Sequence, residues 1–119
     1  MKIFKNASQN SIKAYHGSNK LFNKFDTIHT AQGILWFSED LNDILSGNSG
    51  ALSSKYIYEV QLNVSNPAGW EEYDKLYLDQ IRQQGFDSIH LYDNWVIFEE
   101  NRVKIDRIYE NKDSKLIPV

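Results

Sequence analysis

The chain has 119 residues, which is room for one domain with one core, so we expect residues 1–119 to fold as a single domain. A composition of 41% hydrophobic and 13% aromatic residues is that of a folded globule rather than a disordered chain. The absence of cysteine excludes disulfides and thiolate metal sites. No apolar run approaches the roughly 20 residues that span a bilayer, and the start lacks a signal-peptide core, so we expect a cytoplasmic protein.

The net charge of −3 argues against a general nucleic-acid partner, because a protein that sheathes nucleic acid needs a basic face to neutralise phosphates. The first quarter of the chain is nevertheless basic, with Lys2, Lys5, Lys13, Lys20 and Lys24. Binding of an anionic partner by this part of the chain therefore remains an alternative.

The first half of the chain predicts strands over residues 13–17 and 33–38, after a polar stretch over residues 1–11 that forms either a strand or a loose lead-in. Between the two strands, residues 22–32 carry two phenylalanines and a polar tail, which predicts a loop lying over a pocket. Ser38 is followed by two acidic residues, a pattern typical of the start of a helix. We expect this helix to be short, because glycines follow it closely.

The second half of the chain also predicts strands with a helix between them. Residues 56–62 have the period of a half-buried strand, which the pair Asn66-Pro67 ends. Apolar residues at helical spacing predict one helix over residues 72–84, with Gly85 as its stop. Strands are then expected over residues 88–92 and 95–98.

A tight turn at Asp93-Asn94 is expected between these two strands. A further strand is possible over residues 102–109. The sum is a mostly β, α+β domain with two small packed sheets and a cleft between them.

The run Tyr15-His16-Gly17-Ser18 is the most informative feature of the chain. Glycine lets a ligand approach the backbone closely because no Cβ stands in the way, and the imidazole and hydroxyl beside it can hydrogen-bond a polar ligand. The later pair Trp36-Phe37 offers an aromatic wall. Together these residues predict a pocket for a flat, polar ring carried on a sugar.

In order and spacing these segments resemble the ADP-ribosyltransferase fold, in the histidine-first branch that includes diphtheria toxin and the poly-ADP-ribose polymerases. The nearest likeness is to the small domains of this kind in phage and mobile-element proteins. The resemblance implies a split β-sandwich with few short helices, and NAD bound as a co-substrate in a central cleft without a metal. It runs through Tyr15–Ser18, Phe22–Phe25, Gly33–Ser38, Tyr56–Val60, Gly85–Ile89, Trp95–Phe98 and Val103–Ile105.

The resemblance also implies roles for the residues of the first motif. His16 matches the histidine that hydrogen-bonds the adenosine-side ribose of NAD, and Gly17 matches the glycine whose backbone grips the nicotinamide amide. Ser18 stands where the family carries serine or threonine. Read without the resemblance, His16 is a surface strand residue and Gly17 an ordinary turn residue.

In the second motif, Trp36 matches the aromatic residue that packs near the nicotinamide, and Phe37 and Ser38 complete the predicted NAD-binding set. Because successive strand residues face opposite sides of a sheet, one ring of the Trp36-Phe37 pair is expected in the core. The position of a further stacking tyrosine falls at Gly47, so this part of the pattern is missing.

The third motif departs most from the family. The position of its catalytic glutamate falls at Asn94, and an amide cannot offset the positive charge of an oxocarbenium ion as a carboxylate can. Asp93, one residue away, could reach the site if the turn is bulged. Three outcomes stay open: a transferase that uses Asp93, a slow or transfer-biased enzyme that uses Asn94, or an NAD-binding fold without transfer.

Two hypotheses follow from these motifs. One is a mono-ADP-ribosyltransferase that modifies a macromolecule, which we expect to be a protein, and a protein of the host if the chain is a phage effector. The other is a non-catalytic module of the same fold that inhibits a partner protein by contact. His29 and His90 do not converge with His16 on a metal site, and we expect His90 on the polar face of its strand.

Overall fold

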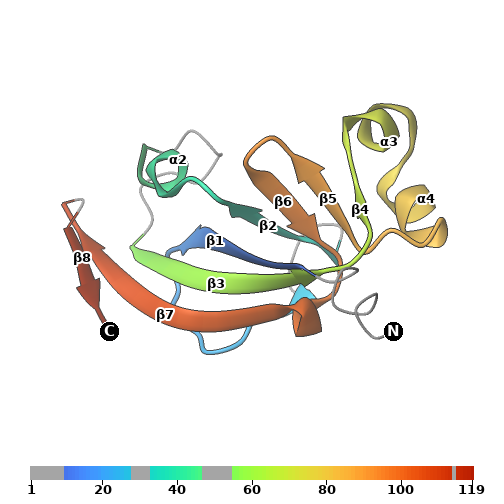
Figure 1. Ribbon diagram of the computed structural model, residues 1–119. Helices are drawn as coiled ribbons and strands as arrows, with labels where there is room; N and C mark the ends of the chain where they lie inside the picture. Colours follow the sequence, from blue (N-terminus) through green and yellow to red (C-terminus); the bar gives the residue numbers. More distant parts are fainter. Residues whose placement is uncertain (1–9, 28–32, 47–54, 114) are drawn as a thin grey trace.

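In the computed structural model, residues 10–27, 33–46, 55–113 and 115–119 are described. They form a mixed α+β domain in which strands dominate and the helices are short (Figure 1). In this part of the chain, no helix is both long and apolar enough to cross a membrane. The elements in chain order are β1 (Asn10–Ser18), β2 (Leu35–Ser38), α2 (Leu41–Ser46), β3 (Tyr56–Val64), β4 (Pro67–Ala68), α3 (Trp70–Lys75), α4 (Leu78–Gln83), β5 (Ser88–Leu91), β6 (Asn94–Ile97), a 3₁₀ turn (Glu100–Arg102), β7 (Val103–Lys112) and β8 (Lys115–Pro118).

The strands form one eight-stranded sheet in the order β4-β5-β6-β2-β1-β3-β7-β8, in which only the β4–β5 pair is parallel. The sheet nearly divides in the middle. β1 pairs with β3 along its whole length, from Asn10 to Ser18, but it pairs with β2 through Tyr15 and Ser38 alone. The expectation of two separate packed sheets is therefore corrected to one sheet with two halves, joined by a single residue pair.

The first core lies between these two halves. It contains residues of β3 such as Tyr58 and Val60 together with Phe37 of β2 and Trp95 of β6, although β3 and β6 are not neighbours in the sheet. The sheet must therefore bend around these side chains. Phe25, from the loop after β1, is buried among them.

The second core lies on the other face of β5 and β6, under the helices α3 and α4 (Figure 1). Ile89, Val96 and Ile81 are fully buried there, and half-buried Tyr73 and Leu78 pack against them. Because Trp95 and Ile97 lie in the first core and Val96 in the second, β6 buries both of its faces.

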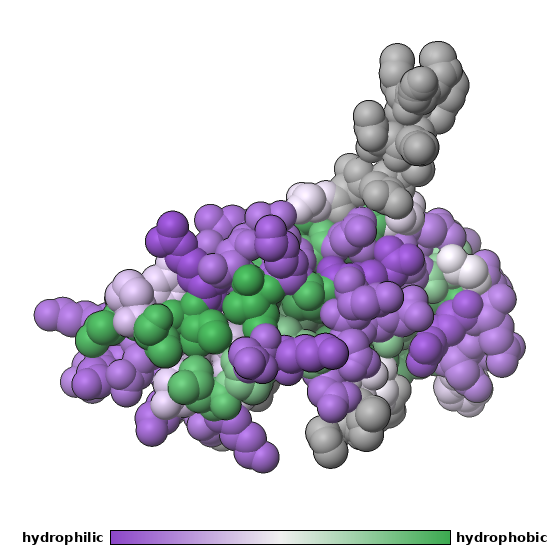
Figure 2. All heavy atoms as spheres, turned by 90° about the horizontal axis from the view of Figure 1, so that it is seen from below, coloured by the Kyte–Doolittle hydropathy of each residue, from purple (hydrophilic) through white to green (hydrophobic). Residues whose placement is uncertain are grey.

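The underside of the molecule mixes apolar and polar side chains. Figure 2, seen from below, shows apolar side chains among polar ones on the side where β7 and β8 lie in Figure 1. Ile117 and Val119 are exposed in this end of the chain.

The single helix expected over residues 72–84 is wrong: two short helices, α3 and α4, take its place. Leu76 between them has extended backbone (φ −122°, ψ 151°), and half-buried Leu76 and Leu78 both pack on the second core. Each helix has its own start signal, because Glu72 accepts a hydrogen bond from the Gly69 N–H at 2.8 Å and Gln80 accepts one from the Tyr77 N–H at 2.8 Å.

The turn expected at Asp93-Asn94 is displaced by one residue. Tyr92 and Asp93 form the turn, and Asn94 is already the first residue of β6. Tyr92 has a φ of 57°, in the left-handed region that favours glycine or asparagine.

Other expectations are confirmed with shifted ends. Gly85 follows α4 with a φ of +94°, as a helix stop requires, and strands occur over most of the predicted stretches. The helix after Ser38 begins three residues later, at Leu41, and the Ser38 hydroxyl accepts a hydrogen bond from the Asp40 N–H at 3.1 Å. The predictions for residues 1–9, His29 and Gly47 lie outside the described residues.

The Tyr58 hydroxyl anchors the loop after β1, and we expect Tyr58→Phe to destabilise the fold. The hydroxyl donates to the carbonyl of Lys20 at 2.8 Å and accepts from the N–H of Phe22 at 2.9 Å. Its removal leaves both backbone groups without this partner, so the free energy of unfolding in urea should fall by about 1–3 kcal/mol. Tyr92→Phe, at an exposed ring, is the control and should change it by less than about 0.5 kcal/mol. Equal effects of the two variants would contradict the anchoring role.

Candidate functional site

The splaying of β1 from β2 opens a pocket of about 470 Å³ at the Ser18 end of β1, a volume typical of ligand sites. One side comes from β1 and β2, and the other from the loop that follows β1. The lining residues are His16, Ser18, Lys20, Phe22, Lys24, Phe25, Asp26 and Leu35. Of the NAD-binding residues predicted from sequence, His16 and Ser18 therefore line this pocket, and the loop over it is where the sequence predicted one.

His16 bridges the two strands at the place where their main-chain pairing stops. Its Nδ1 lies 2.8 Å from the carbonyl oxygen of Trp36. A carbonyl only accepts hydrogen bonds, so Nδ1 carries the proton and Nε2 is left as an acceptor. The ring packs against Phe25 and Phe37, at centroid distances of 5.1 and 5.5 Å.

Burial lowers the pKa of His16 below its ordinary value of 6.5, and the hydrogen bond to Trp36 offsets this only in part. The imidazole is therefore neutral at pH 7. A neutral ring with Nε2 as an acceptor suits a ligand hydroxyl, such as that of a ribose, better than it suits a phosphate.

The loop wall of the pocket is aromatic and fixed in place. Phe22 stacks on Tyr58 with a centroid distance of 4.3 Å and an interplanar angle of 11°, and Phe25 meets Phe22 edge-on at 4.9 Å. The two hydrogen bonds of the Tyr58 hydroxyl hold the same loop. A flat apolar ring of a ligand can pack against such a wall without first ordering it.

The polar lining gives the pocket an excess of positive charge. Lys20 and Lys24 supply two ammonium groups, against one carboxylate from Asp26. The Ser18 hydroxyl accepts a hydrogen bond from the Lys20 N–H at 3.1 Å, which leaves its own proton to be donated. Sequence reasoning missed these lysines as site residues, although it noted that the first quarter of the chain is basic.

Of the remaining predicted site residues, Phe37 contacts the His16 ring, but none of them is among the residues that line the pocket. Ser38 is paired with Asn94 across β2 and β6, and Trp36 is paired with Val96 of the second core, so Trp36, Ser38 and Asn94 share the face opposite to Phe37. Ser38 is completely buried, and Trp36 is 43% exposed. The expectation that one ring of the Trp36-Phe37 pair lies in the core is confirmed, and that ring is Phe37.

The two predicted catalytic residues also lie apart from the pocket. Neither Asp93 nor Asn94 is among its lining residues. Asp93 is exposed, and its carboxylate lies within 4.8 Å of those of Asp40 and Asp43, a grouping that could hold a cation. Its carbonyl accepts a hydrogen bond from the Glu39 N–H at 2.7 Å, which fixes the turn against the end of β2. Gly17 stays in the regular pairing of β1 with Ile57 of β3.

A carboxylate–imidazole pair that sequence reasoning missed lies at the outer end of β2. Glu39 Oε2 accepts the indole N–H of buried Trp95 at 2.6 Å and lies 3.3 Å from Nε2 of His90. His90 stacks on Trp95 with a centroid distance of 4.0 Å. His90 is exposed, as expected, but its ring and its nitrogen both have partners. In the sequence, only the alternation of side chains along the predicted strands of His90 and Trp95 indicates this contact.

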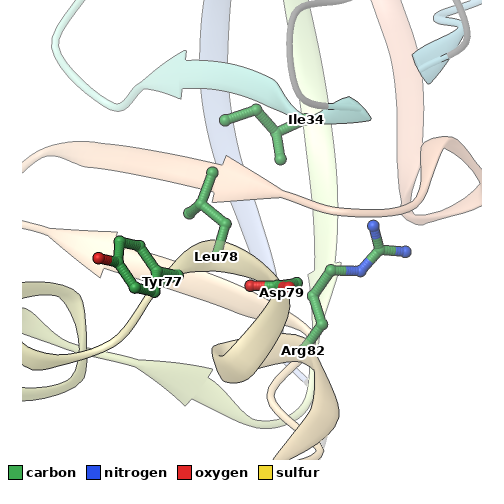
Figure 3. Close-up of a pocket in the computed structure, with 5 residues that line it drawn as sticks. All are labelled: Ile34, Tyr77, Leu78, Asp79 and Arg82. Atoms are coloured by element: carbon green, nitrogen blue, oxygen red, sulfur yellow. The ribbon is translucent and has the colours of Figure 1, made fainter.

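A second hollow of about 470 Å³ lies on the helix side, at the start of α4 (Figure 3). In the close-up, Leu78 points toward Ile34, and Tyr77 and Arg82 point away from each other. Asp79 and Arg82 supply one charge of each sign. This hollow therefore has no preference for an anion, unlike the pocket around His16.

No model of a known protein family matches the chain, and a search of curated protein sequences finds no match either.

The neutral state of His16 makes a testable contribution to the pH dependence of stability. Because its pKa is lower in the folded chain than the 6.5 of an unperturbed histidine, the unfolded chain binds more protons below pH 6.5. The free energy of unfolding should be level above about pH 7 and fall as the pH drops toward 5. His16→Gln should flatten this fall in urea titrations, and His90→Gln, which keeps His16, should retain it. A fall of the same size in His16→Gln would show that His16 does not cause it.

Proposed function

We propose that the pocket around His16 binds NAD and that the chain is an ADP-ribosyltransferase that transfers a single ADP-ribose unit to a protein. The observation that carries this proposal is the lining of one pocket by a neutral imidazole, two ammonium groups and two phenyl rings. A dinucleotide offers the matching parts: ribose hydroxyls, a diphosphate and flat rings. The resemblance to the histidine-first ADP-ribosyltransferases, whose histidine motif His16 matches, narrows the ligand to NAD.

In this proposal each part of NAD has a partner. Nε2 of His16 accepts a hydrogen bond from a ribose hydroxyl, because Nδ1 already donates to Trp36. Lys20 and Lys24 neutralise the diphosphate, for which compact ammonium charges are suited. A ring of the ligand packs on Phe22 and Phe25.

Cleavage of the bond between nicotinamide and ribose places positive charge on the ribose, and a nearby carboxylate stabilises that charge. Among the described residues, Asp26 is the carboxylate that lines the pocket. We therefore assign this role to Asp26 in preference to Asp93 or Asn94, which lie outside the pocket. The electron pair of the broken bond goes to nicotinamide, and the acceptor's nucleophile attacks the ribose carbon and loses its proton.

The placement of Asn94 favours one alternative. Because the third-motif position carries an amide and lies on the face opposite to Phe37, the chain could keep the pocket and lack the transfer reaction. It would then act by contact, as a binding module that inhibits a partner protein.

Calorimetry with NAD tests the pocket itself. We expect wild type to bind NAD, and His16→Ala and Lys24→Ala each to weaken binding about tenfold or more, because each change removes a polar contact worth at least about 1.4 kcal/mol. Lys75→Ala, at an exposed lysine of α3, is the control and should leave the affinity unchanged. If wild type does not bind NAD, the proposal fails.

Release of nicotinamide and transfer of labelled ADP-ribose to proteins of a bacterial lysate test the reaction. We expect Asp26→Asn to lower both rates about 100-fold or more, because the loss of one group that stabilises transition-state charge lowers enzyme rates by about this factor. Asp93→Asn and Asn94→Ala are the matched controls and should keep the wild-type rates. NAD binding without nicotinamide release or transfer in wild type would favour the binding module, and loss of rate in Asp93→Asn alone would restore the assignment made from sequence.

A further inference from the structure

Three aromatic rings gather on the surface beside the start of α3, away from the pocket around His16. The ring of Trp70 lies 5.8 Å from that of Tyr73 and 5.4 Å from that of Tyr92, in the turn between β5 and β6. Trp70 is 42% exposed and Tyr92 is 81% exposed. We name these three residues the aromatic patch. Aromatic side chains gathered in the open are typical of surfaces that bind a partner.

The backbone of Tyr92 shows that the fold does not require a tyrosine in this turn. Its φ of 57° is adopted readily by glycine and asparagine, and costs other residues about 1–2 kcal/mol. The ring is too exposed to recover this cost through burial in the core. What Tyr92 supplies is therefore a ring at the surface, next to Trp70.

The surroundings of the aromatic patch are acidic. Glu71 follows Trp70, and Asp93 follows Tyr92. The carboxylate of Asp93 is grouped with those of Asp40 and Asp43 within 4.8 Å. Lys75 lies 3.8 Å from Glu71 and offsets the charge of that carboxylate. The surface thus combines the exposed rings of Trp70 and Tyr92 with neighbouring carboxylates.

We propose that the aromatic patch docks a basic, lysine- or arginine-rich segment of a partner protein. Cationic side chains are attracted to the faces of Trp and Tyr rings, and the best geometry has the cation over the ring. Neighbouring carboxylates accept charge-assisted hydrogen bonds from the same segment. Charge complementarity selects this partner, because nucleic acids and acidic proteins would be repelled by Asp40, Asp43, Asp93 and Glu71.

Docking at the aromatic patch is separate from NAD binding and needs no nucleotide. Four labelled peptides of equal length serve as probes: arginine–serine, lysine–serine, glycine–serine and glutamate–serine repeats. Fluorescence anisotropy should show binding of the two basic peptides alone, and the affinity should fall as salt rises.

Two variants test the aromatic and the ionic contributions to peptide binding separately. Tyr92→Asn removes the ring but suits the positive φ, so the turn is kept, and it should weaken binding of the arginine peptide about three- to tenfold. Asp93→Asn should weaken it by a similar factor and reduce its salt dependence. Tyr77→Ser is the matched control: it removes a tyrosine that is 79% exposed but lies outside the aromatic patch, and it should not change binding.

Several outcomes would overturn the proposal. One is that the neutral peptide binds as tightly as the basic peptides. Another is that both Tyr92→Asn and Asp93→Asn bind the arginine peptide with wild-type affinity. A dimer in sedimentation that Tyr92→Asn dissociates would assign the aromatic patch to a second copy of the chain instead. Displacement of the peptide by stoichiometric Ca²⁺ or Mg²⁺ would assign the three aspartates to a metal ion.

Discussion

The hydrogen bond from His16 Nδ1 to the carbonyl of Trp36 is the contact around which the two halves of the sheet are arranged. Main-chain pairing between β1 and β2 consists of Tyr15 and Ser38 alone, and the imidazole spans the gap just beyond that pair. A side chain can hold two strands at a spacing that main-chain bonds cannot, so the sheet stays joined while it opens. The same contact fixes the tautomer of the ring and makes Nε2 the atom available to a ligand.

The loop after β1 forms the second wall of this opening and makes it a pocket. Tyr58 is paired with His16 across β1 and β3, and its hydroxyl holds the loop through two backbone hydrogen bonds. Phe25 packs edge-on against the imidazole and Phe22 packs against Phe25, and burial of the imidazole lowers the pKa of His16. Stability and site chemistry therefore depend on the same few side chains, because the aromatic contacts that close the first core also keep the histidine neutral.

The sequence predicts local features of this structure better than the assembly of the site. Alternation along β3 and the glycine at position 85 report on the chain's own backbone, so the strand and the helix stop are correctly predicted. The break at Leu76 is invisible to periodicity, since Tyr73, Tyr77 and Ile81 keep a helical spacing across it. Only the packing of Leu76 and Leu78 on the second core shows why the backbone is extended there. The division of the site residues between two faces depends on register between strands. A shift of the turn by one residue, from Asp93-Asn94 to Tyr92-Asp93, decides where Asn94 begins to pair.

The two surfaces of the domain carry opposite charge, and this separates what each can bind. Lys20 and Lys24 face the pocket between the sheet halves, whereas Asp40, Asp43 and Asp93 lie at the far end of β2 and the turn before β6. In the proposed function, the positive charge of the pocket would attract an anionic ligand and the acidic surface next to Trp70 and Tyr92 would repel it. A basic partner held at the acidic surface would leave the pocket open. A net charge of −3 therefore describes neither surface, because it sums the 13 basic and 16 acidic residues of the whole chain.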